Sequence, residues 1–304
     1  MGGVEWTELK LSGPGLARSS HAVAVQQDTL YLFGGEQAAR EPVSSALWHL
    51  DLTAASASWT ETPSTGPGPV PRFGHTMCQL AGKLWLFGGR SGLAIDELLL
   101  ADLWVFDPVT AVWKEVETKG SPPSPRSFHA MAALGTRLYI FGGCPSGGRA
   151  ADLFVFDTET AVWSELAVAT GVEGRGGASL VAEPGTNSLL LLGGFAGREM
   201  GDLHRYSVAG NSWTRLEEEL VPARSVSCAA SLAGTTVLYG GELEPSARGH
   251  AGAGSFTAAT LLQAGRAGGA AASAGPPARG WAATAVWRDT TMVVVGGLQV
   301  PGNP

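Results

Sequence analysis

One short pattern recurs along this 304-residue chain: an apolar run of strand length that ends in two glycines. The six copies are LYLFGG at 30–35, LWLFGG at 84–89, LYIFGG at 138–143, LLLLGG at 189–194, TVLYGG at 236–241 and MVVVGG at 292–297. Their final glycines lie 54, 54, 51, 47 and 56 residues apart. A period of about 50 residues indicates a repeat architecture, whose units bury their apolar faces only against their neighbours.

Two further markers occur in the same order in the repeated units. An arginine, here called the entry arginine, precedes each diglycine strand; the six are Arg18, Arg72, Arg126, Arg175, Arg224 and Arg279. A segment of strand, turn and tryptophan follows the glycines, as in DLWVFDPVTAVW at 102–113, DLFVFDTETAVW at 152–163 and DLHRYSVAGNSW at 202–213. Such segments are typical of β-hairpins. With 43 glycines, 18 prolines and only 15% charged residues, the composition also favours short strands and tight turns over helices.

These markers predict an all-β fold with four short antiparallel strands in each unit. Small sheets bury both faces by stacking around an axis, so we expect a six-bladed β-propeller, and its period is similar to that of kelch repeats. Each glycine pair is expected to lie near the crowded axis, with a positive φ or no room for a side chain. Four tryptophans are expected to form rigid plates between sheets: Trp59, Trp113, Trp163 and Trp213.

The whole chain, 1–304, is predicted to be one propeller. Its blades are placed at about 11–62, 65–116, 119–166, 170–216 and 220–275, with blade six at about 279–304 plus the N-terminal strand 4–10. Glu5 to Leu9 has the pattern of a last strand with no strand before it, so we expect this strand to complete blade six and close the ring. The Gly/Ala-rich residues 263–278 are expected to form a disordered or loosely packed excursion in place of the outer strand of blade five.

Charge and cysteine content exclude several classes of protein. The net charge of −7 provides no basic surface for nucleic acid or anionic membrane, and no apolar run is long enough to span a bilayer. The three cysteines, Cys78, Cys144 and Cys228, cannot form a paired disulfide framework. We therefore expect a cytoplasmic protein, with the nucleus as a further location, that is a monomer and binds a small molecule or a protein partner at the propeller rim.

The residues that follow the glycine pairs are expected to share one face of the propeller with the entry arginines, because strand directions alternate within a blade. In blade order they are Glu36, Arg90, Cys144, Phe195, Glu242 and Leu298. We call this set the diglycine rim. It carries acids and an arginine at the ends of a rigid scaffold, which is where ligands commonly bind. Glu36 and Arg90 are accordingly candidate substrate-binding residues.

Several motifs resemble one branch of the kelch proteins, namely the plant nitrile-specifier, epithiospecifier and thiocyanate-forming proteins and their less specialised relatives. The motifs are RSSH at 18–21, RGG at 175–177, ARS at 223–225, GHAGAG at 249–254 and RGW at 279–281. The resemblance implies a non-haem Fe(II) site with the ligand pattern Glu-x-x-x-Asp-x-x-x-His. This pattern falls on Glu242, Ser246 and His250, so serine takes the place of the expected aspartate. It also implies that Arg90 and Arg175 bind the sulfate of the substrate.

Structural interpretations remain open for the same residues. Entry arginines can instead bond carbonyl groups of the blade, and Glu242 and His250 can instead stabilise a Gly-rich loop by hydrogen bonds. The histidines that recur three residues after an entry arginine, His21, His75 and His129, indicate a structural role. The aspartates that open the third strands, Asp102, Asp152 and Asp202, are expected to accept hydrogen bonds from turn amides.

Three functions follow from these interpretations. The first is a specifier-like, Fe(II)-assisted site that acts on a sulfated thiohydroximate, the aglucone of a glucosinolate. The second is a non-catalytic module whose rim binds a partner protein. The third, a sugar-handling kelch enzyme, has no distinctive motif in this chain. The sequence leaves open whether the protein is an enzyme, since a fold of this type carries many unrelated functions.

Overall fold

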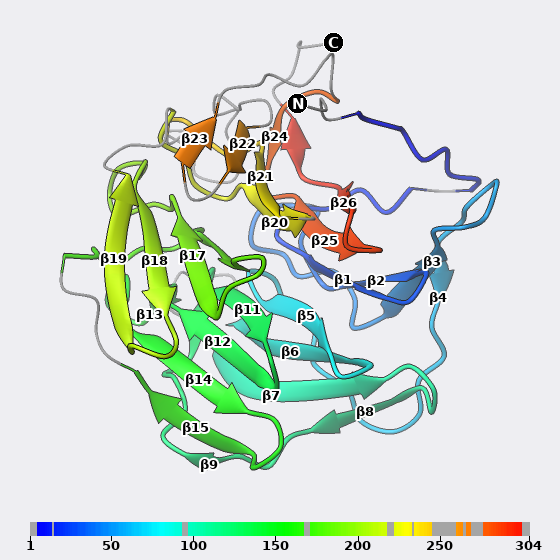
Figure 1. The fold of residues 1–304 in the computed structure, drawn as a ribbon. Coiled ribbons are helices and arrows are strands. Elements are labelled where there is room, and N and C mark those ends of the chain that lie inside the picture. The colour runs from blue at the N-terminus through cyan, green and yellow to red at the C-terminus, as the bar shows by residue number, and fades with distance from the viewer. Residues whose placement is uncertain are drawn as a thin grey trace.

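The computed structural model describes residues 5–13, 15–92, 97–166, 171–217, 222–232, 234–244, 260–263, 266–268 and 276–299. Within these ranges the regular structure consists of β-strands, and six sheets are arranged around a common centre (Figure 1). The innermost strands of neighbouring sheets contact one another in a closed cycle, β1, β5, β11, β16, β20 and β25, with β25 against β1. This arrangement is the predicted β-propeller, and its six sheets are consistent with six blades.

Blades one and two are both four-stranded antiparallel sheets. Blade one consists of β1 (Ala22–Gln26), β2 (Thr29–Phe33), β3 (Leu47–Asp51) and β4 (Thr60–Glu61). Blade two consists of β5 (Thr76–Leu80), β6 (Lys83–Arg90), β7 (Leu99–Asp107) and β8 (Val112–Glu115). In both blades the order in the sheet is the order in the chain, so each strand pairs with the next through a short connection.

Blades three and four repeat this antiparallel order. Blade three consists of β11 (Ala130–Leu134), β12 (Arg137–Phe141), β14 (Leu153–Asp157) and β15 (Val162–Glu165), with β9 (Lys119–Gly120) added in parallel at its outer edge. Blade four consists of β16 (Ser179–Ala182), β17 (Ser188–Leu192), β18 (Leu203–Ser207) and β19 (Ser212–Glu217).

Blades five and six differ from the first four. Blade five consists of β20 (Cys228–Leu232), β21 (Thr235–Tyr239), β22 (Thr260–Gln263) and β23 (Arg266–Gly268). Blade six contains β25 (Ala283–Trp287) and β26 (Thr291–Val295) as a two-stranded sheet. Two short ladders complete the list, β10 (Arg126–Ser127) with β13 (Cys144–Pro145), and β24 (Arg279–Gly280) with β27 (Leu298–Gln299).

The excursion predicted at 263–278 includes a short strand. β23 pairs with β22 in an antiparallel register, Leu262 opposite Ala267, so blade five does have an outer strand. The hydrogen bonds between antiparallel strands join backbone groups and do not require large side chains, so a Gly/Ala-rich segment can form a strand. Residues 269–275 lie outside the described part of the chain. In the part that the structure describes, no helix is long and apolar enough to cross a membrane.

Each glycine pair turns the chain at the inner end of the second strand, as predicted. Both glycines of every pair have positive φ, for example +63° at Gly34 and +94° at Gly35. A Cβ added to Gly35 would lie 2.7 Å from the carbonyl oxygen of Ser19 and from the Cβ of His21. Positive φ and this close backbone approach both exclude a side chain, so glycine is needed at this place for two independent reasons.

The predicted tryptophan plates lie between sheets. Trp113 of blade two packs on Phe33 of blade one, with ring centroids 5.7 Å apart. Trp163 contacts Phe87 at 5.4 Å in the same way, and Trp213 contacts Phe141 at 5.5 Å. Each tryptophan therefore covers the residue that precedes the diglycine of the previous blade. Trp59 packs at the corresponding junction, against a cluster that includes residues of blade six.

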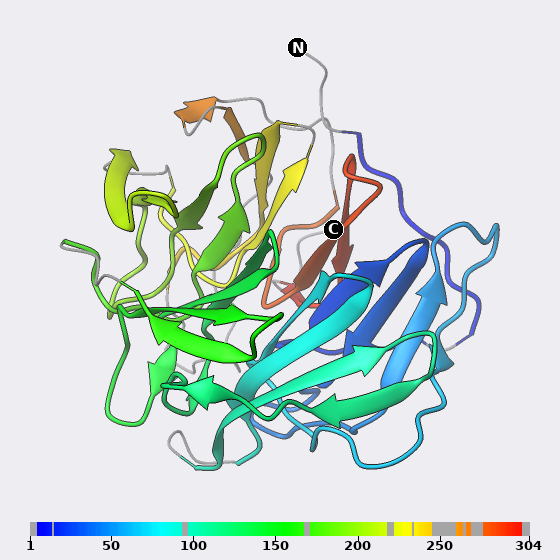
Figure 2. The same ribbon diagram turned by 60° about the horizontal axis from the view of Figure 1, so that its bottom comes forward.

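The N-terminal segment does not complete blade six as a paired strand, in contrast to the prediction. Among the described residues 5–13 there is no strand, and blade six is two-stranded in the structure, so the N-terminal segment is not a paired fourth strand there. Its side chain Trp6 nevertheless packs on Tyr239, with ring centroids 4.8 Å apart, and beside Met292 and Val294 of blade six. The segment thus supplies the plate between blades five and six through packing of one side chain, without a backbone ladder. The tilted view shows the N-terminal segment beside the last blade (Figure 2).

Candidate functional site

A closed belt of backbone hydrogen bonds surrounds the axis. It runs through the second residue after each entry arginine, and its donors in order are Ser20, Gly74, Phe128, Gly177, Val226 and Trp281. Each N–H donates to the carbonyl of the belt residue in the preceding blade, and Ser20 N–H closes the belt on Trp281 O at 3.0 Å. All six residues have positive φ, between +47° and +64°. The belt and the residues that follow it line a small axial cavity of about 110 Å³.

The entry arginines are built into the blades. In every blade the Nη1 of the entry arginine donates to the carbonyl of the first glycine in its own diglycine, as from Arg72 to Gly88 at 3.0 Å. In five of the blades the carbonyl of the entry arginine in turn accepts from the second glycine of the preceding blade, as from Gly35 N to Arg72 O at 2.9 Å, and Gly297 N donates in the same way to Arg18 O. These arginines therefore join neighbouring blades, which confirms the structural interpretation.

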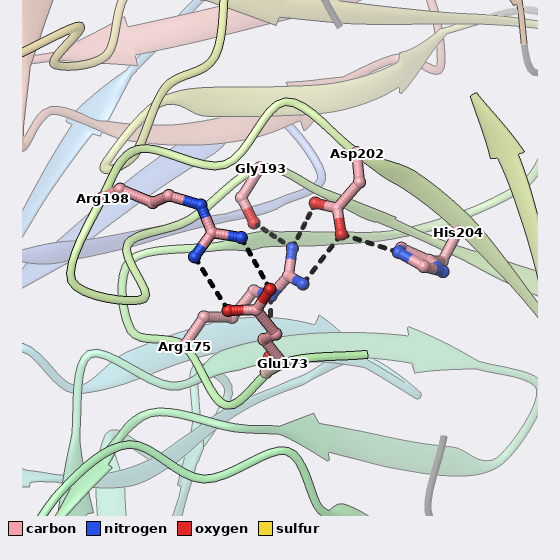
Figure 3. Close-up of polar contacts among 6 residues, drawn as sticks. All are labelled: Glu173, Arg175, Gly193, Arg198, Asp202 and His204. Carbon is pink, nitrogen blue, oxygen red and sulfur yellow. Dashed lines mark hydrogen bonds and ion pairs between the residues drawn. The ribbon is translucent and has the colours of Figure 1, made fainter. Parts of the chain in front are cut away.

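Arg175, which the resemblance assigns to substrate sulfate, is held in the same way. Its side chain is buried, and it donates to the carbonyl groups of Gly193 and Glu173 and to both carboxylate oxygens of Asp202 (Figure 3). His204 also bonds Asp202, with Nε2 2.8 Å from Oδ2. Few donors remain on this guanidinium for a substrate, so the geometry gives Arg175 the role of the other entry arginines.

The prediction that the strand-opening aspartates satisfy turn amides was wrong. Asp102 accepts from Nη1 and Nη2 of Arg72, both at 2.7 Å, and from the ring nitrogen of Trp104. Asp152 pairs with Arg126 and Asp202 with Arg175 in the same forked geometry. Hydrogen bonds from the arginine lower the pKa of Asp102 against the opposing effect of burial. A buried cation across the sheet competes better for these carboxylates than solvated turn amides do.

The residues of the diglycine rim share one face, as predicted. Each forms an antiparallel bridge with the residue that follows an entry arginine: Ser19 with Glu36, Phe73 with Arg90, Ser127 with Cys144, Gly176 with Phe195, Ser225 with Glu242 and Gly280 with Leu298. Glu36 points towards the axial belt, because its Oε1 accepts from the hydroxyl of Ser20 at 2.6 Å. Burial raises the pKa of Glu36, and that hydrogen bond, the amide of Arg40 and the charge of Arg90 oppose this rise.

Arg90 is a buried cation at the same rim. Its guanidinium carbon lies 4.7 Å from the ring centre of Phe73 and 6.0 Å from that of Phe128, a member of the axial belt. The charge acts on Glu36 on one side and on the thiol of Cys144 on the other. Burial outweighs this effect at Cys144 and raises the pKa of its thiol, so the neutral form is favoured. Cys144 accordingly lacks the character of a nucleophile.

Glu242 and Glu199 are two acids whose charges interact between blades four and five. Glu242 is buried at the rim, and its backbone exchanges hydrogen bonds with Ser225. Burial, together with the charge of Glu242, raises the pKa of Glu199 to about 7, while the nearby hydroxyl of Ser225 opposes the rise. Sequence reasoning missed Glu199 because it lies five residues after its diglycine, outside the repeated pattern.

The predicted metal ligands are only partly covered by the structure. Ser246 and His250 lie outside the described residues. The described part contains no group of three or more histidine, cysteine, aspartate or glutamate side chains that could hold a metal. It does contain Glu199 and Glu242, two acids whose charges interact, and Glu199 also accepts from the hydroxyl of Ser225. Two adjacent carboxylates fit a divalent cation by the chemistry of their oxygen donors.

The three recurring histidines are buried beside the axial cavity. Burial and the charge of the nearby entry arginine lower the pKa of His21 to about 3, and burial lowers that of His129 to the same value. The imidazoles are therefore neutral, and His75 packs edge-on against Phe33 of the preceding blade. This placement agrees with the structural role expected from their repeat position. The three cysteines are free thiols.

The fold and the diglycine rim place the chain in a class of β-propellers in which an entry arginine and a glycine pair join neighbouring blades. Residues 20–241 match the KLHDC2/KLHL20/DRC7 Kelch-repeats domain, and the chain belongs to this kelch-repeat family. It is 30% identical over 283 residues to N-(sulfonatooxy)prop-2-enimidothioate sulfolyase of Thlaspi arvense, covering 83% of this chain and 79% of that protein. This relative bears out the resemblance to specifier proteins.

Two further similarities are more limited. The Rab9 effector protein with kelch motifs of Bos taurus is 42% identical over 95 residues, and the match covers 30% of this chain and 25% of that protein. The solved structure of YjhT is 19% identical with a TM-score of 0.74, covering 96% of this chain and 94% of its own. At this level of identity the solved structure supports the propeller fold alone.

Proposed function

We propose that this kelch propeller binds a small sulfated thiohydroximate at the diglycine rim and, with Fe(II), directs its breakdown as specifier proteins do. The observation that carries the proposal is Arg90, a buried guanidinium on the rim beside the axial belt. The related sulfolyase, similar over most of both chains, supports the class of substrate.

Arg90 suits an oxyanion in both geometry and charge. A planar guanidinium has paired donors that match a sulfate group, and that of Arg90 lies over the ring of Phe73. Arg175 has no comparable role, because its donors are committed to Asp202 and to backbone carbonyls. Glu242 and His250, the ligands that the resemblance implies, would hold the iron, which, when bound, would supply a Lewis acid with open positions for the substrate's sulfur.

The test is a product analysis with myrosinase and a glucosinolate under anaerobic conditions with Fe(II). We expect the protein to shift product from isothiocyanate towards nitrile or related products, and Arg90→Gln to reduce that shift at least tenfold. Arg198→Gln serves as the control, because Arg198 is an exposed arginine paired with Glu173. The proposal fails if the wild-type protein leaves the product ratio of myrosinase unchanged, or if Arg90→Gln behaves as wild type.

A second function, binding of a partner protein, is favoured by Leu98. This side chain is 61% exposed, and its carbonyl accepts from Ser91 N, directly after Arg90. An exposed apolar side chain at the rim would add apolar area to an interface with a protein. If the rim binds a protein, Leu98→Asp should abolish capture of that protein. Val109→Asp, at a 93% exposed site in the β7–β8 turn, should leave capture unchanged.

A further inference from the structure

The second strand of blade six is more exposed than the second strand of any other blade in the described structure. In the other blades β2, β6, β12, β17 and β21 are buried along most of their length, whereas Met292 to Val295 of β26 are only partly buried. Each of those five strands pairs with a third strand on its outer side, and β26 pairs with β25 alone. The exposure of β26 therefore follows from a sheet edge whose backbone groups can pair with an added strand.

Trp6 marks where a third strand would pack beside this edge. In blades two, three and four an aromatic residue of the third strand packs on the tryptophan of its own blade, with ring centroids 5.1 Å, 4.9 Å and 5.2 Å apart. These aromatic residues are Phe106, Phe156 and Tyr206. Trp6 takes the place of the blade tryptophan in blade six, beside Met292 and Val294 of β26. In the geometry of the other blades, an aromatic side chain of an added strand would contact Trp6.

Arg279 places a positive charge at the start of the same edge. Its Nη1 donates to Gly296 O at 3.0 Å and its Nε to Pro277 O at 3.3 Å, and Arg72 makes the corresponding two bonds in blade two. The entry arginines of blades two to four also pair with the aspartate that opens the third strand. Arg279 hydrogen-bonds the side chain of Tyr239, but it forms no ion pair with a described acid, and it is the one entry arginine that is not buried. An acidic residue at the start of an added strand would therefore meet a guanidinium that is already held in position.

We propose that the outer edge of β26 binds an extended segment of a partner polypeptide as the third strand of blade six. The third strands of blades two to four define the chemistry of this segment, because each begins with Asp-Leu-x-x-aromatic, in DLWVF, DLFVF and DLHRY. In their register the leucine lies opposite the residue before the diglycine, as Leu153 lies opposite Phe141. The same register on β26 places the leucine opposite Val295 and the aromatic residue opposite Met292. The inference does not rest on the proposed function, which concerns the diglycine rim.

The proposal is tested with a fluorescein-labelled peptide of the sequence GDLHRYSV, residues 201–208, the most polar of the three third strands. Fluorescence anisotropy measures its binding to the full-length protein. We expect saturable binding, and a peptide with the same residues in scrambled order should bind about tenfold more weakly or less. The substitution Asp202→Asn in the peptide should also weaken binding about tenfold, since it removes the charge that would pair with Arg279. This comparison changes only the peptide, so it does not depend on the folding of a protein variant.

A protein variant identifies the charge that the peptide meets. Arg279→Gln should bind the aspartate peptide as weakly as the wild-type protein binds the asparagine peptide, and its affinity for the asparagine peptide should be unchanged. Arg198→Gln, which removes an exposed arginine of blade four, is the matched control and should bind both peptides as wild type does. The thermal unfolding midpoint of each variant checks its folding.

Hydrogen exchange locates the bound peptide. It should slow the exchange of the β26 amides that face the outer edge and leave β12, which has a strand on both sides, unchanged. The proposal is overturned if the wild-type protein binds the ordered and scrambled peptides equally, or the aspartate and asparagine peptides equally. Slow exchange at the outer edge of β26 before peptide is added would also overturn it, because another part of the chain or a second copy would then cover this edge. Peptide binding without any effect on glucosinolate products would instead contradict the proposed function alone.

Discussion

Ala46 occupies the position that Asp102, Asp152 and Asp202 hold in the next three blades. In each case the following leucine pairs with the residue before the diglycine, for example Leu47 with Phe33 and Leu103 with Phe87. Blade one therefore contains a buried entry arginine, Arg18, whose Nε has no hydrogen-bond partner in the described structure. Burial lowers the pKa of Arg18, as expected for a cation with weak compensation.

Ala46→Asp should stabilise the protein, because it places a carboxylate opposite Arg18 in the geometry of the other blades. Charge-assisted hydrogen bonds of this kind contribute about 1–2 kcal/mol. Urea unfolding of the variant should show a higher midpoint at an unchanged slope. Ala38→Asp, in the exposed connection of the same blade, is the control and should have little effect. An unchanged midpoint for Ala46→Asp would show that Arg18 is already compensated.

Asp152→Ala should have the opposite effect, and a larger one. Arg126 is 1% exposed and donates to both oxygens of Asp152, so the variant leaves an unpaired buried charge. Loss of one partner of a buried pair costs about 3 kcal/mol or more. Chemical denaturation should show this loss, whereas Arg137→Ala, which removes the half-exposed partner of Asp157, should cost much less. Equal losses in the two variants would contradict the assignment.

The N-terminal segment acts as part of blade six through a single side chain. Trp6 takes the place at Tyr239 that Trp113 takes at Phe33, so the junction of blades five and six resembles the other junctions in side-chain packing. It differs in backbone pairing, since β26 has no partner strand on its outer side among the described residues. β26 therefore has a ladder with β25 on its inner side only, and its outer side is held by side-chain packing.

Trp6→Ala should therefore loosen blade six in preference to the other blades. Removal of a partly buried tryptophan costs about 2 kcal/mol or more, and the loss falls on the junction that contains Met292 and Val294. Hydrogen exchange should accelerate in β25 and β26 while β11 and β12 keep their protection. Trp6→Phe should restore most of the protection. Uniform acceleration in all blades would show that the ring opens as one unit.

Around the axis, the buried histidines make the stability of the whole ring depend on pH. The pKa of His21 and of His129 is lowered from 6.5 to about 3, so the unfolded chain binds more protons than the folded chain between these values. Their contribution is complete above pH 6.5 and is lost as the pH falls towards 3. The loss is at most about 1.4 kcal/mol per pH unit for each histidine. The raised pKa of Glu199 acts in the opposite direction, because its stabilising protonated form is lost as the pH rises towards 7.

His21→Ser should flatten this dependence, since Ser227 occupies the same ring position in blade five. Unfolding midpoints between pH 7.5 and 4.5 should fall less steeply for the variant than for the wild-type protein. The difference between the two proteins isolates the histidine from Glu199 and the other acids. Parallel curves would show that His21 is not neutral in the folded state.

The sequence alone predicted the features that repeat. Spacing located the glycine pairs, the tryptophan plates and the rim, because each depends on a position that recurs in every blade. The sequence did not predict the ion pair of Arg126 with Asp152. The repeat shows which position of the blade a residue occupies, but it does not show which residue 26 positions away is its partner. Sequence reasoning missed Glu199, because the corresponding residues of blades one and three, Pro42 and Arg149, are not acidic and no repeated pattern marks the position. The sequence predicted that the N-terminal segment lies at blade six. It could not show whether the segment pairs as a strand, because Trp6 can pack there with or without a backbone ladder.

At the centre of the molecule, the six backbone hydrogen bonds of the belt hold the blades together, while the side chains of the same residues line the axial cavity. Its bonds use only main-chain atoms, so they impose no side-chain identity on Ser20, Gly74, Phe128, Gly177, Val226 or Trp281. Serine, glycine, phenylalanine, valine and tryptophan all occur there with nearly the same φ. Substitutions at these positions can therefore change the width or the polarity of the axial cavity while the backbone of the belt stays the same. Each belt residue can therefore change the entrance of the axial cavity without a change in the blades that surround it.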